Sequence, residues 1–259
     1  MDVDVIDKTD NKLILSLEKI SPGYSNALRR IILAEVPTMA MEDIEFRDNS
    51  SALYDEIIAH RLGLIPLTTD LKTYNEKTDC KCKGEGCARC QLKLILKEDG
   101  PKTVYAKDLN TTDPKVVPVY EKTIIVKLLK NQSLEFEATA ELGRGKVHSK
   151  WSPGHIYYKI KPIINVDNRK IKDPQVIKEV CPVGVFDVKK GKLVVIEKEL
   201  YKCHNCEGCT DLSDGITIEE NEEDYIFYVE SWGQLAPKDM ILKGIDVFDE
   251  KLEEFRNII

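Results

Sequence analysis

The sequence predicts a mixed α+β fold in which short strands outnumber helices. Three observations favour this class. Apolar and polar residues alternate with a period of two in many short segments, as they do in half-buried strands. Only four segments carry helix signals. Eight cysteines fall into two groups of four, which indicates segments of the chain that are organised by bound metal.

Composition excludes several classes of protein. The chain has 259 residues, of which 42% are hydrophobic, and a formal net charge of −7; this is the composition of a globular protein with packed cores. No apolar run reaches the roughly 18 to 20 residues that cross a bilayer, and the first residues are acidic where a signal peptide is basic. We therefore expect a cytoplasmic protein with no membrane contact. The acidic balance argues against direct binding of nucleic acid, because Lys and Arg supply most of that affinity.

Alternating apolar residues predict a β-hairpin at the start of the chain. Val3 and Val5 alternate with acidic residues, and leucines continue the alternation over 13–17 after a turn at 10–11. A short strand is expected around Ile44 and Phe46, which also alternate with charged residues. Further strands are expected over 92–96, 123–128, 157–166, 185–188, 193–196, 216–218 and 225–229.

Two segments are predicted to be rich in loops or turns. Residues 67–150 are expected to be an inserted, loop-rich region with little core of its own, because turn and charged residues are frequent there. Near the C-terminus, the acidic run 219–224 predicts a solvated turn between two strands.

Three of the four helix signals lie before residue 180. The first predicts a helix over 25–36, which Pro37 ends. The second predicts a helix over 53–62, with Gly63 as its stop. The third is Asp173-Pro174, a capping residue followed by proline, which is typical of a helix start.

The fourth helix signal is an apolar stripe at the C-terminus, which we call the seam. Its members are separated by 4, 3, 4, 3 and 4 residues, the spacing of a helix that packs on another helix. Periodicity alone does not decide between a helix that lies on its own core and one that contacts another subunit. The seam consists of Ile241, Ile245, Phe248, Leu252, Phe255 and Ile259.

The second cysteine group has the spacing of an iron–sulfur site. Cys203, Cys206 and Cys209 lie three residues apart, which suits three corners of a cuboidal cluster. Cys181 precedes a proline, as the remaining ligand of a bacterial ferredoxin run does, and is the expected fourth ligand. The segment looks like a ferredoxin-like domain with one 4Fe-4S cluster, or 3Fe-4S as isolated. The alternative is zinc on the same four thiols.

The first cysteine group predicts a zinc site. Cys80, Cys82, Cys87 and Cys90 place four thiols within eleven residues, with two glycines between them that allow a tight backbone path. Four thiolates suit tetrahedral zinc and leave no open position for a substrate water, so the expected role is structural. A second iron–sulfur cluster is the alternative.

Three motifs resemble a known family. They are Ser-Asn-Ala-Leu-Arg-Arg-Ile-Ile-Leu-Ala-Glu-Val-Pro-Thr over 25–38, Asp-Glu-Ile-Ile-Ala-His-Arg-Leu-Gly-Leu-Ile-Pro-Leu over 55–67, and Lys-Val-His-Ser-Lys-Trp-Ser-Pro over 146–153. Together they resemble the α-type assembly subunit family of the large DNA-directed RNA polymerases, and within that family the archaeal D-type members. The resemblance covers nearly the whole chain.

The resemblance implies a fold and a set of partners. Both chain ends would form an α-type dimerisation domain, whose two helices would pack against a smaller α-like partner, subunit L. Contacts with subunits N and P and with the second-largest subunit are also implied. Among the polar motif residues, His60 and Arg61 would make assembly contacts, with plain solvation as the alternative. The expected partner-binding residues are Ala27, Leu28, Arg29, Arg30, Ile31, Ile241, Ile245, Phe248, Leu252 and Phe255.

Four domain segments follow from the motifs and the cysteines. The dimerisation domain would comprise 1–47 and 219–259, the inserted β-rich domain 48–166 with the cysteine loop 80–90, and the ferredoxin-like domain 167–218.

The resemblance implies a scaffold rather than a catalyst. Nucleotidyl transfer needs magnesium held by clustered carboxylates, and the sequence has no dense aspartate triad, no Walker-type phosphate loop and no nucleophile motif. We therefore expect a polymerase subunit without catalytic residues of its own. The alternative is a ferredoxin-like electron-transfer protein, although such a carrier needs neither the assembly motifs nor the seam.

Overall fold

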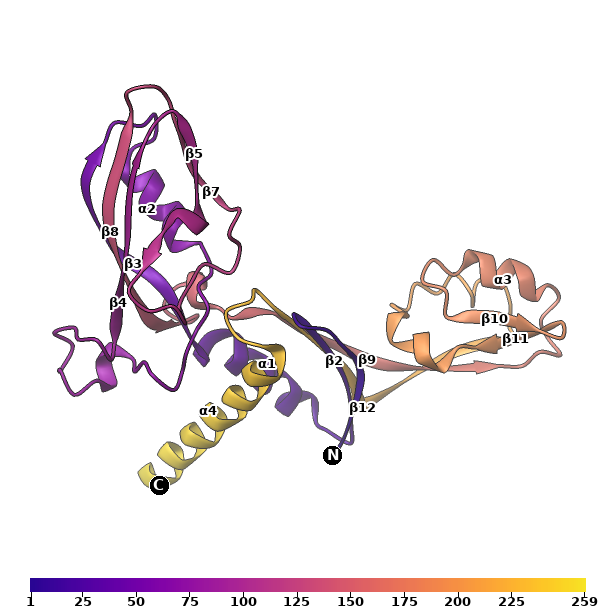
Figure 1. Ribbon diagram of the computed structural model, residues 1–259. Coiled ribbons are helices and arrows are strands. Elements are labelled where there is room, and N and C mark those ends of the chain that lie inside the picture. The colour runs from indigo at the N-terminus through magenta and orange to yellow at the C-terminus, as the bar shows by residue number, and fades with distance from the viewer. The chain divides into compact units, whose positions relative to one another are not determined.

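The computed structural model describes residues 1–259 and has both helices and sheets, which confirms the α+β class (Figure 1). The chain forms two compact units, each made of two separate stretches. One unit comprises 1–26 and 157–229, and the other comprises 27–156 and 230–259. No helix has the length and apolar character needed to cross a membrane. These units do not test the four predicted domain segments, which stay a prediction.

A four-stranded sheet organises the first unit. Its order is β1-β2-β12-β9, where β1 is Asp2–Lys8, β2 is Lys12–Glu18, β9 is Gly154–Val166 and β12 is Ile216–Ser231. Strands β1 and β2 pair antiparallel, with Val3 opposite Leu17 and Val5 opposite Leu15. The predicted N-terminal hairpin is therefore confirmed.

The acidic turn predicted over 219–224 is wrong. These residues lie inside β12, which runs without a break through both strands that the turn was expected to join. Their side chains are solvated or paired with polar neighbours: Asn165 donates to Glu219 at 3.0 Å, and the Lys19 amide donates to Asp224 at 3.2 Å. The strand persists because its backbone is paired, as in the 3.0 Å hydrogen bond from the Ile20 amide to the Glu223 carbonyl.

The part of this unit that carries the second cysteine group is small. Helix α3 (Pro174–Val180) begins as predicted, with the Asp173 carboxylate accepting from the amides of Gln175 and Val176. Strands β10 (Phe186–Lys189) and β11 (Lys192–Val195) form the predicted hairpin, and the 3₁₀ helix η4 (Glu197–Lys202) follows. The buried core here contains two cysteines, and its members are Ile177, Val185, Phe186, Leu193, Cys203, Cys209 and Ile216.

The second unit holds the other two sheets. The larger has the order β3-β8-β4-β6, and the smaller pairs β5 with β7. The strand predicted around Ile44 and Phe46 is longer than expected, because β3 begins at Pro37, directly after α1. The bounds are α1 Pro22–Glu35, which starts in the first unit, β3 Pro37–Asn49, α2 Asp55–Gly63, β4 Gln91–Asp99, β5 Lys102–Tyr105, β6 Asn110–Thr111, β7 Ile124–Leu128, β8 Ser133–Arg144 and α4 Pro237–Ile258. Short 3₁₀ helices lie at Lys77–Asp79, Ala106–Asp108 and Ser149–Trp151.

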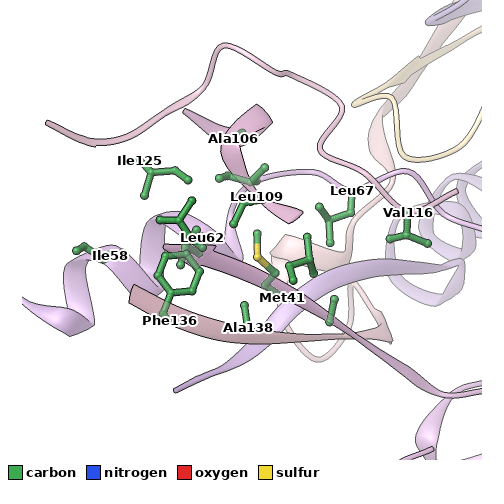
Figure 2. Close-up of a cluster of buried hydrophobic side chains, with 14 of the residues drawn as sticks. Met41, Ile58, Leu62, Leu67, Ala106, Leu109, Val116, Ile125, Phe136 and Ala138 are labelled. Carbon is green, nitrogen blue, oxygen red and sulfur yellow. The ribbon is translucent and has the colours of Figure 1, made fainter. Parts of the chain in front are cut away.

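The prediction that residues 67–150 have little core of their own is wrong. They supply most of a large buried cluster, in which α2 places Ile58 and Leu62 near Phe136 of β8 (Figure 2). Strands β4 and β8 bury every second residue, including Leu94 and Ala138. Each fully buried leucine or phenylalanine contributes about 1.5–3 kcal/mol. The charged residues between them face outward and give the segment its loop-like composition.

Helix α4 packs on α1 through a stripe that differs from the seam. Met240, Gly244 and Val247 are buried, and a Cβ atom on Gly244 would lie only 2.6 Å from Cγ1 of Ile32 on α1. The two helix backbones therefore approach closely at this glycine.

The close approach predicts the effect of Gly244→Ala. Helix propensity favours alanine over glycine by about 1 kcal/mol, but Ile32 is fully buried and the crowded atom is not at the end of its side chain. We expect net destabilisation by about 1–3 kcal/mol, measured as a lower denaturation midpoint. Gly23→Ala is the control, because its Cβ would meet nothing within 4 Å. A Gly244→Ala protein as stable as its parent would contradict the packing.

Candidate assembly face and metal centres

The seam of α4 is only partly buried by the chain itself. Ile241, Ile245 and Phe248 are half-buried, whereas Leu252 is 52% exposed and Phe255 is 62% exposed. The C-terminal end of α4 extends away from α1 (Figure 1). One stripe of the helix therefore lies on the protein's own core, and the seam beside it remains accessible to another helix. Contact between the seam and another subunit stays a prediction.

The predicted partner-binding residues of α1 differ in their exposure. Arg30 is exposed, and Ala27, Arg29 and Ile31 are half-buried, so all four can contribute to a contact surface. Leu28 has only 6% of its surface exposed. Its side chain is part of the protein's own interior in this structure.

Helix α2 presents two polar motif residues, His60 and Arg61, which are both exposed. Arg61 also has a structural contact, because its Nη1 donates to the Ile125 carbonyl of β7 at 2.9 Å. This contact holds α2 against the β5-β7 sheet. A substitution of Arg61 would therefore change the packing as well as the surface.

Ion pairs of Glu35 connect the C-terminal end of α1 to β8 and α4. Its carboxylate accepts from Arg144 Nη1 at 3.1 Å and lies 3.4 Å from Lys251 Nζ of α4. Burial alone would raise the pKa of Glu35, but these cations outweigh burial and hold the pKa below its ordinary value. Arg144 also makes a bidentate pair with Glu76, just before the first cysteine loop, with contacts of 2.8–3.0 Å. Spacing in the sequence gives no signal for this network, because its members come from four separate segments.

The first cysteine group forms a compact four-sulfur site. All four Sγ atoms lie within 4.8 Å of one another. The Cys80–Cys87 and Cys82–Cys90 distances are both 3.6 Å, and Cys87–Cys90 is 3.9 Å. A tetrahedral ion with metal–sulfur bonds of about 2.3 Å needs sulfur–sulfur distances of about 3.8 Å. The donor set and its spacing therefore fit a single tetrahedral ion.

The local backbone explains how a short loop gathers four thiols. Lys83, Gly84 and Gly86 have left-handed φ angles of 56°, 87° and 93°, which reverse the chain between the cysteine pairs. Burial raises the pKa of the Cys90 thiol, whereas hydrogen bonds from Cys80 and from backbone amides lower the pKa of Cys82. Metal binding would displace the protons that remain on these thiols.

This geometry predicts the effect of Cys90→Ser. A thiolate ligand is lost at a fully buried position, so we expect the metal bound at this site to fall from about one ion per chain to a small fraction of that. Residues 75–90 should become sensitive to protease. Cys206→Ser, which removes a cysteine of the other group, is the matched control. A Cys90→Ser protein that keeps the parent's metal content at this site would contradict this set of ligands.

The second cysteine group surrounds one pocket. Cys181, Cys203, Cys206 and Cys209 all line it, together with apolar side chains that include Phe186. Burial raises the pKa of Cys209. A cuboidal cluster binds each thiolate through a different iron, so four cysteines around one apolar pocket are a donor set that fits it.

The triplet is bent around this pocket by two uncommon backbone conformations. Asn205 has φ 53° and Glu207 has φ 61°, which are left-handed values that few residues other than glycine adopt. They stand between successive cysteines and turn the chain so that the three thiols line the same pocket.

Comparison with known proteins identifies the class. Residues 43–167, from β3 to just beyond the end of β9, match the family model described as the RNA polymerase Rpb3/RpoA insert domain. The α+β fold therefore contains an insert domain of the kind found in Rpb3- and RpoA-type RNA polymerase subunits.

Full-length relatives narrow the class to one family. The chain is 36% identical to DNA-directed RNA polymerase subunit Rpo3 of Methanosphaera stadtmanae, covering 100% of this chain and 98% of that protein. It is 35% identical to Rpo3 of Archaeoglobus fulgidus, covering 100% and 97%, and 35% identical to Rpo3 of Pyrococcus furiosus, covering 98% and 95%. The chain belongs to the archaeal Rpo3 family.

Membership confirms the resemblance seen in the motifs. The chain is an assembly subunit of a DNA-directed RNA polymerase, and it is not the catalytic subunit of that enzyme. The matches give the alternative of an electron-transfer protein no support.

Proposed function

We propose that α1 and α4 form the face on which a smaller α-like subunit, L, completes a heterodimer, and that this pair is the platform for polymerase assembly. The single observation that supports this most is the position of the seam. It lies beside the stripe that packs on α1, and its last two large members before the helix end, Leu252 and Phe255, are mostly exposed.

Energetics favour a covered seam. Apolar side chains of this size contribute about 1.5–3 kcal/mol each when they move from water into a packed interface. The neighbouring α1 side chains Ala27 and Ile31 are half-buried and would extend the same surface. Arg29 and Arg30 stand beside them and would make polar contacts at its rim, where charges set orientation more than affinity.

Further contacts belong to the same proposal. The exposed His60 and Arg61 of α2 would face other polymerase subunits, namely N, P or the second-largest subunit. The dimerisation domain would comprise 1–47 and 219–259, with the insert over 48–166 and the ferredoxin-like domain over 167–218. The protein would act in the cytoplasm without direct contact with nucleic acid or membrane, in keeping with its net charge of −7.

The two cysteine groups would hold structural metals. Zinc would occupy the group at Cys80–Cys90, supported by the sulfur–sulfur distances of 3.6–3.9 Å. One 4Fe-4S cluster, or 3Fe-4S as isolated, would occupy the pocket lined by Cys181 and the triplet. When bound, each group would cross-link its small segment of chain. Iron, sulfide and zinc analysis of anaerobically purified protein tests both assignments.

Co-expression with an archaeal L subunit tests the assembly role. We expect a one-to-one complex that survives size-exclusion chromatography at high salt, because an interface built on apolar helices is not screened by salt. The molar mass of the eluting species, measured by light scattering, gives the stoichiometry. A chain that elutes alone under these conditions would exclude the proposed heterodimer.

A further inference from the structure

Two side chains from neighbouring strands hold the segment that enters the cysteine triplet. Lys159 of β9 donates from Nζ to the carbonyl oxygen of Cys203. Tyr228 of β12 donates from its hydroxyl to the carbonyl oxygen of Tyr201 at 2.6 Å. Strands β9 and β12 are adjacent in the sheet, so both contacts fix this segment to one sheet of the first unit.

Lys159 carries a positive charge but has no carboxylate partner. Its side chain is half-buried, and Nζ lies 5.7 Å from the ring centroid of Tyr228, which stacks on Tyr157 with centroids 4.5 Å apart. Lys161, two residues further along the same strand, pairs instead with Glu18 at 2.6 Å. Burying an ammonium group without a counter-charge is costly. A negative charge near Cys203 would therefore stabilise Lys159 at this position.

The second cysteine group supplies that charge when it is loaded. Four thiolates give a cluster a net negative charge, and the pocket that they line is otherwise largely apolar, with Ile164, Val183 and Phe186 among its walls. Such a pocket solvates an anion poorly. Charge and hydrogen bonds around the ligand sulfurs are the means by which a protein stabilises a cluster and sets its potential.

We propose that Lys159 is the counter-charge and positioning residue of the iron–sulfur site formed by Cys181, Cys203, Cys206 and Cys209, and that Tyr228 positions the same segment without adding charge. The inference rests on the proposed cluster. It assigns the two side chains distinct effects: Lys159 acts on both the retention and the potential of the cluster, whereas Tyr228 acts on its retention alone.

The test uses the full chain in complex with L, loaded anaerobically with iron and sulfide. For Lys159→Met, we expect an iron chelator to remove the cluster about tenfold faster than from the parent, measured as loss of the cluster's visible absorbance. Such an effect is common when a residue that contacts a metal ligand is removed. The midpoint potential, titrated with dithionite as the electron donor, should be more negative because a nearby positive charge favours the reduced cluster. Lys159→Arg should restore the potential.

Two further variants make the result specific. Lys161→Met removes the same charge from the same strand, away from Cys203, and should match the parent in both readouts. Tyr228→Phe removes only the hydroxyl; it should speed cluster loss and leave the potential unchanged, and it keeps the proposal testable if Lys159→Met fails to fold. A Lys159→Met protein that matches the parent and Lys161→Met would overturn the role of Lys159. A parent that binds no iron would instead overturn the cluster assignment itself.

Discussion

Replacing both Leu252 and Phe255 with alanine is expected to weaken binding of the L subunit by about 100-fold or more. The two side chains are 52% and 62% exposed in the free chain, and loss of their burial removes about 3 kcal/mol or more in total. Fold stability should change little, because neither side chain belongs to the protein's core. Titration calorimetry of the purified chain with L measures the effect.

The control for this variant lies on the other side of α4. Glu250 and Glu254 are exposed and, at 3.6 residues per turn, face away from the seam. Glu250→Ala combined with Glu254→Ala should leave the affinity for L within a few-fold of the parent. Equal losses in the two double variants would mean that general helix destabilisation, and not the seam, determines binding.

Cys203→Ser should loosen residues 167–218 while binding to L is retained. The core of this segment is small, and Cys203 and Cys209 are two of its seven buried residues. The proposed cluster would cross-link this small core, and loss of one ligand would remove that cross-link, because metal binding and folding are coupled in such small domains. We expect proteolysis within 167–218 to accelerate by about tenfold or more, typical of lost cluster affinity. Limited proteolysis followed by mass spectrometry locates the cuts.

Cys82→Ser is the matched control for that experiment. It removes one cysteine of the first group and should leave 167–218 as resistant as in the parent. If Cys203→Ser resists protease as the parent does, the cluster is not what holds this segment together. If the Cys203→Ser protein also fails to bind L, then residues 167–218 and the assembly face are coupled. This result would contradict the proposed separation of their roles.

Local signals in the sequence were sufficient for several elements. The alternation of Val3 and Val5 predicted the N-terminal hairpin, and Asp173-Pro174 predicted the start of α3, because each pattern depends on neighbouring residues alone. The seam could be predicted from its spacing in the same way. Its exposure could not, because burial depends on which stripe of α4 meets α1.

The missed features depend on contacts between distant residues. The acidic stretch of β12 has no strand-like alternation, and its backbone is held by partners such as Ile20, about two hundred residues earlier. The core of the insert forms because inward residues of β3, β4 and β8 meet. Lys159, Arg144 and Tyr228 belong to none of the sequence motifs. Only the fold brings Lys159 to Cys203, Arg144 to Glu35 and Tyr228 to Tyr201.

Hydrogen–deuterium exchange of the chain, alone and in complex with L, tests the central claim most directly. If α1 and α4 form the partner-binding face, amides over 27–31 and 241–255 should become strongly protected in the complex, while those of β10 and β11 keep their exchange rates. Protection confined to other elements, with α4 exchanging as fast as in the free chain, would contradict the account.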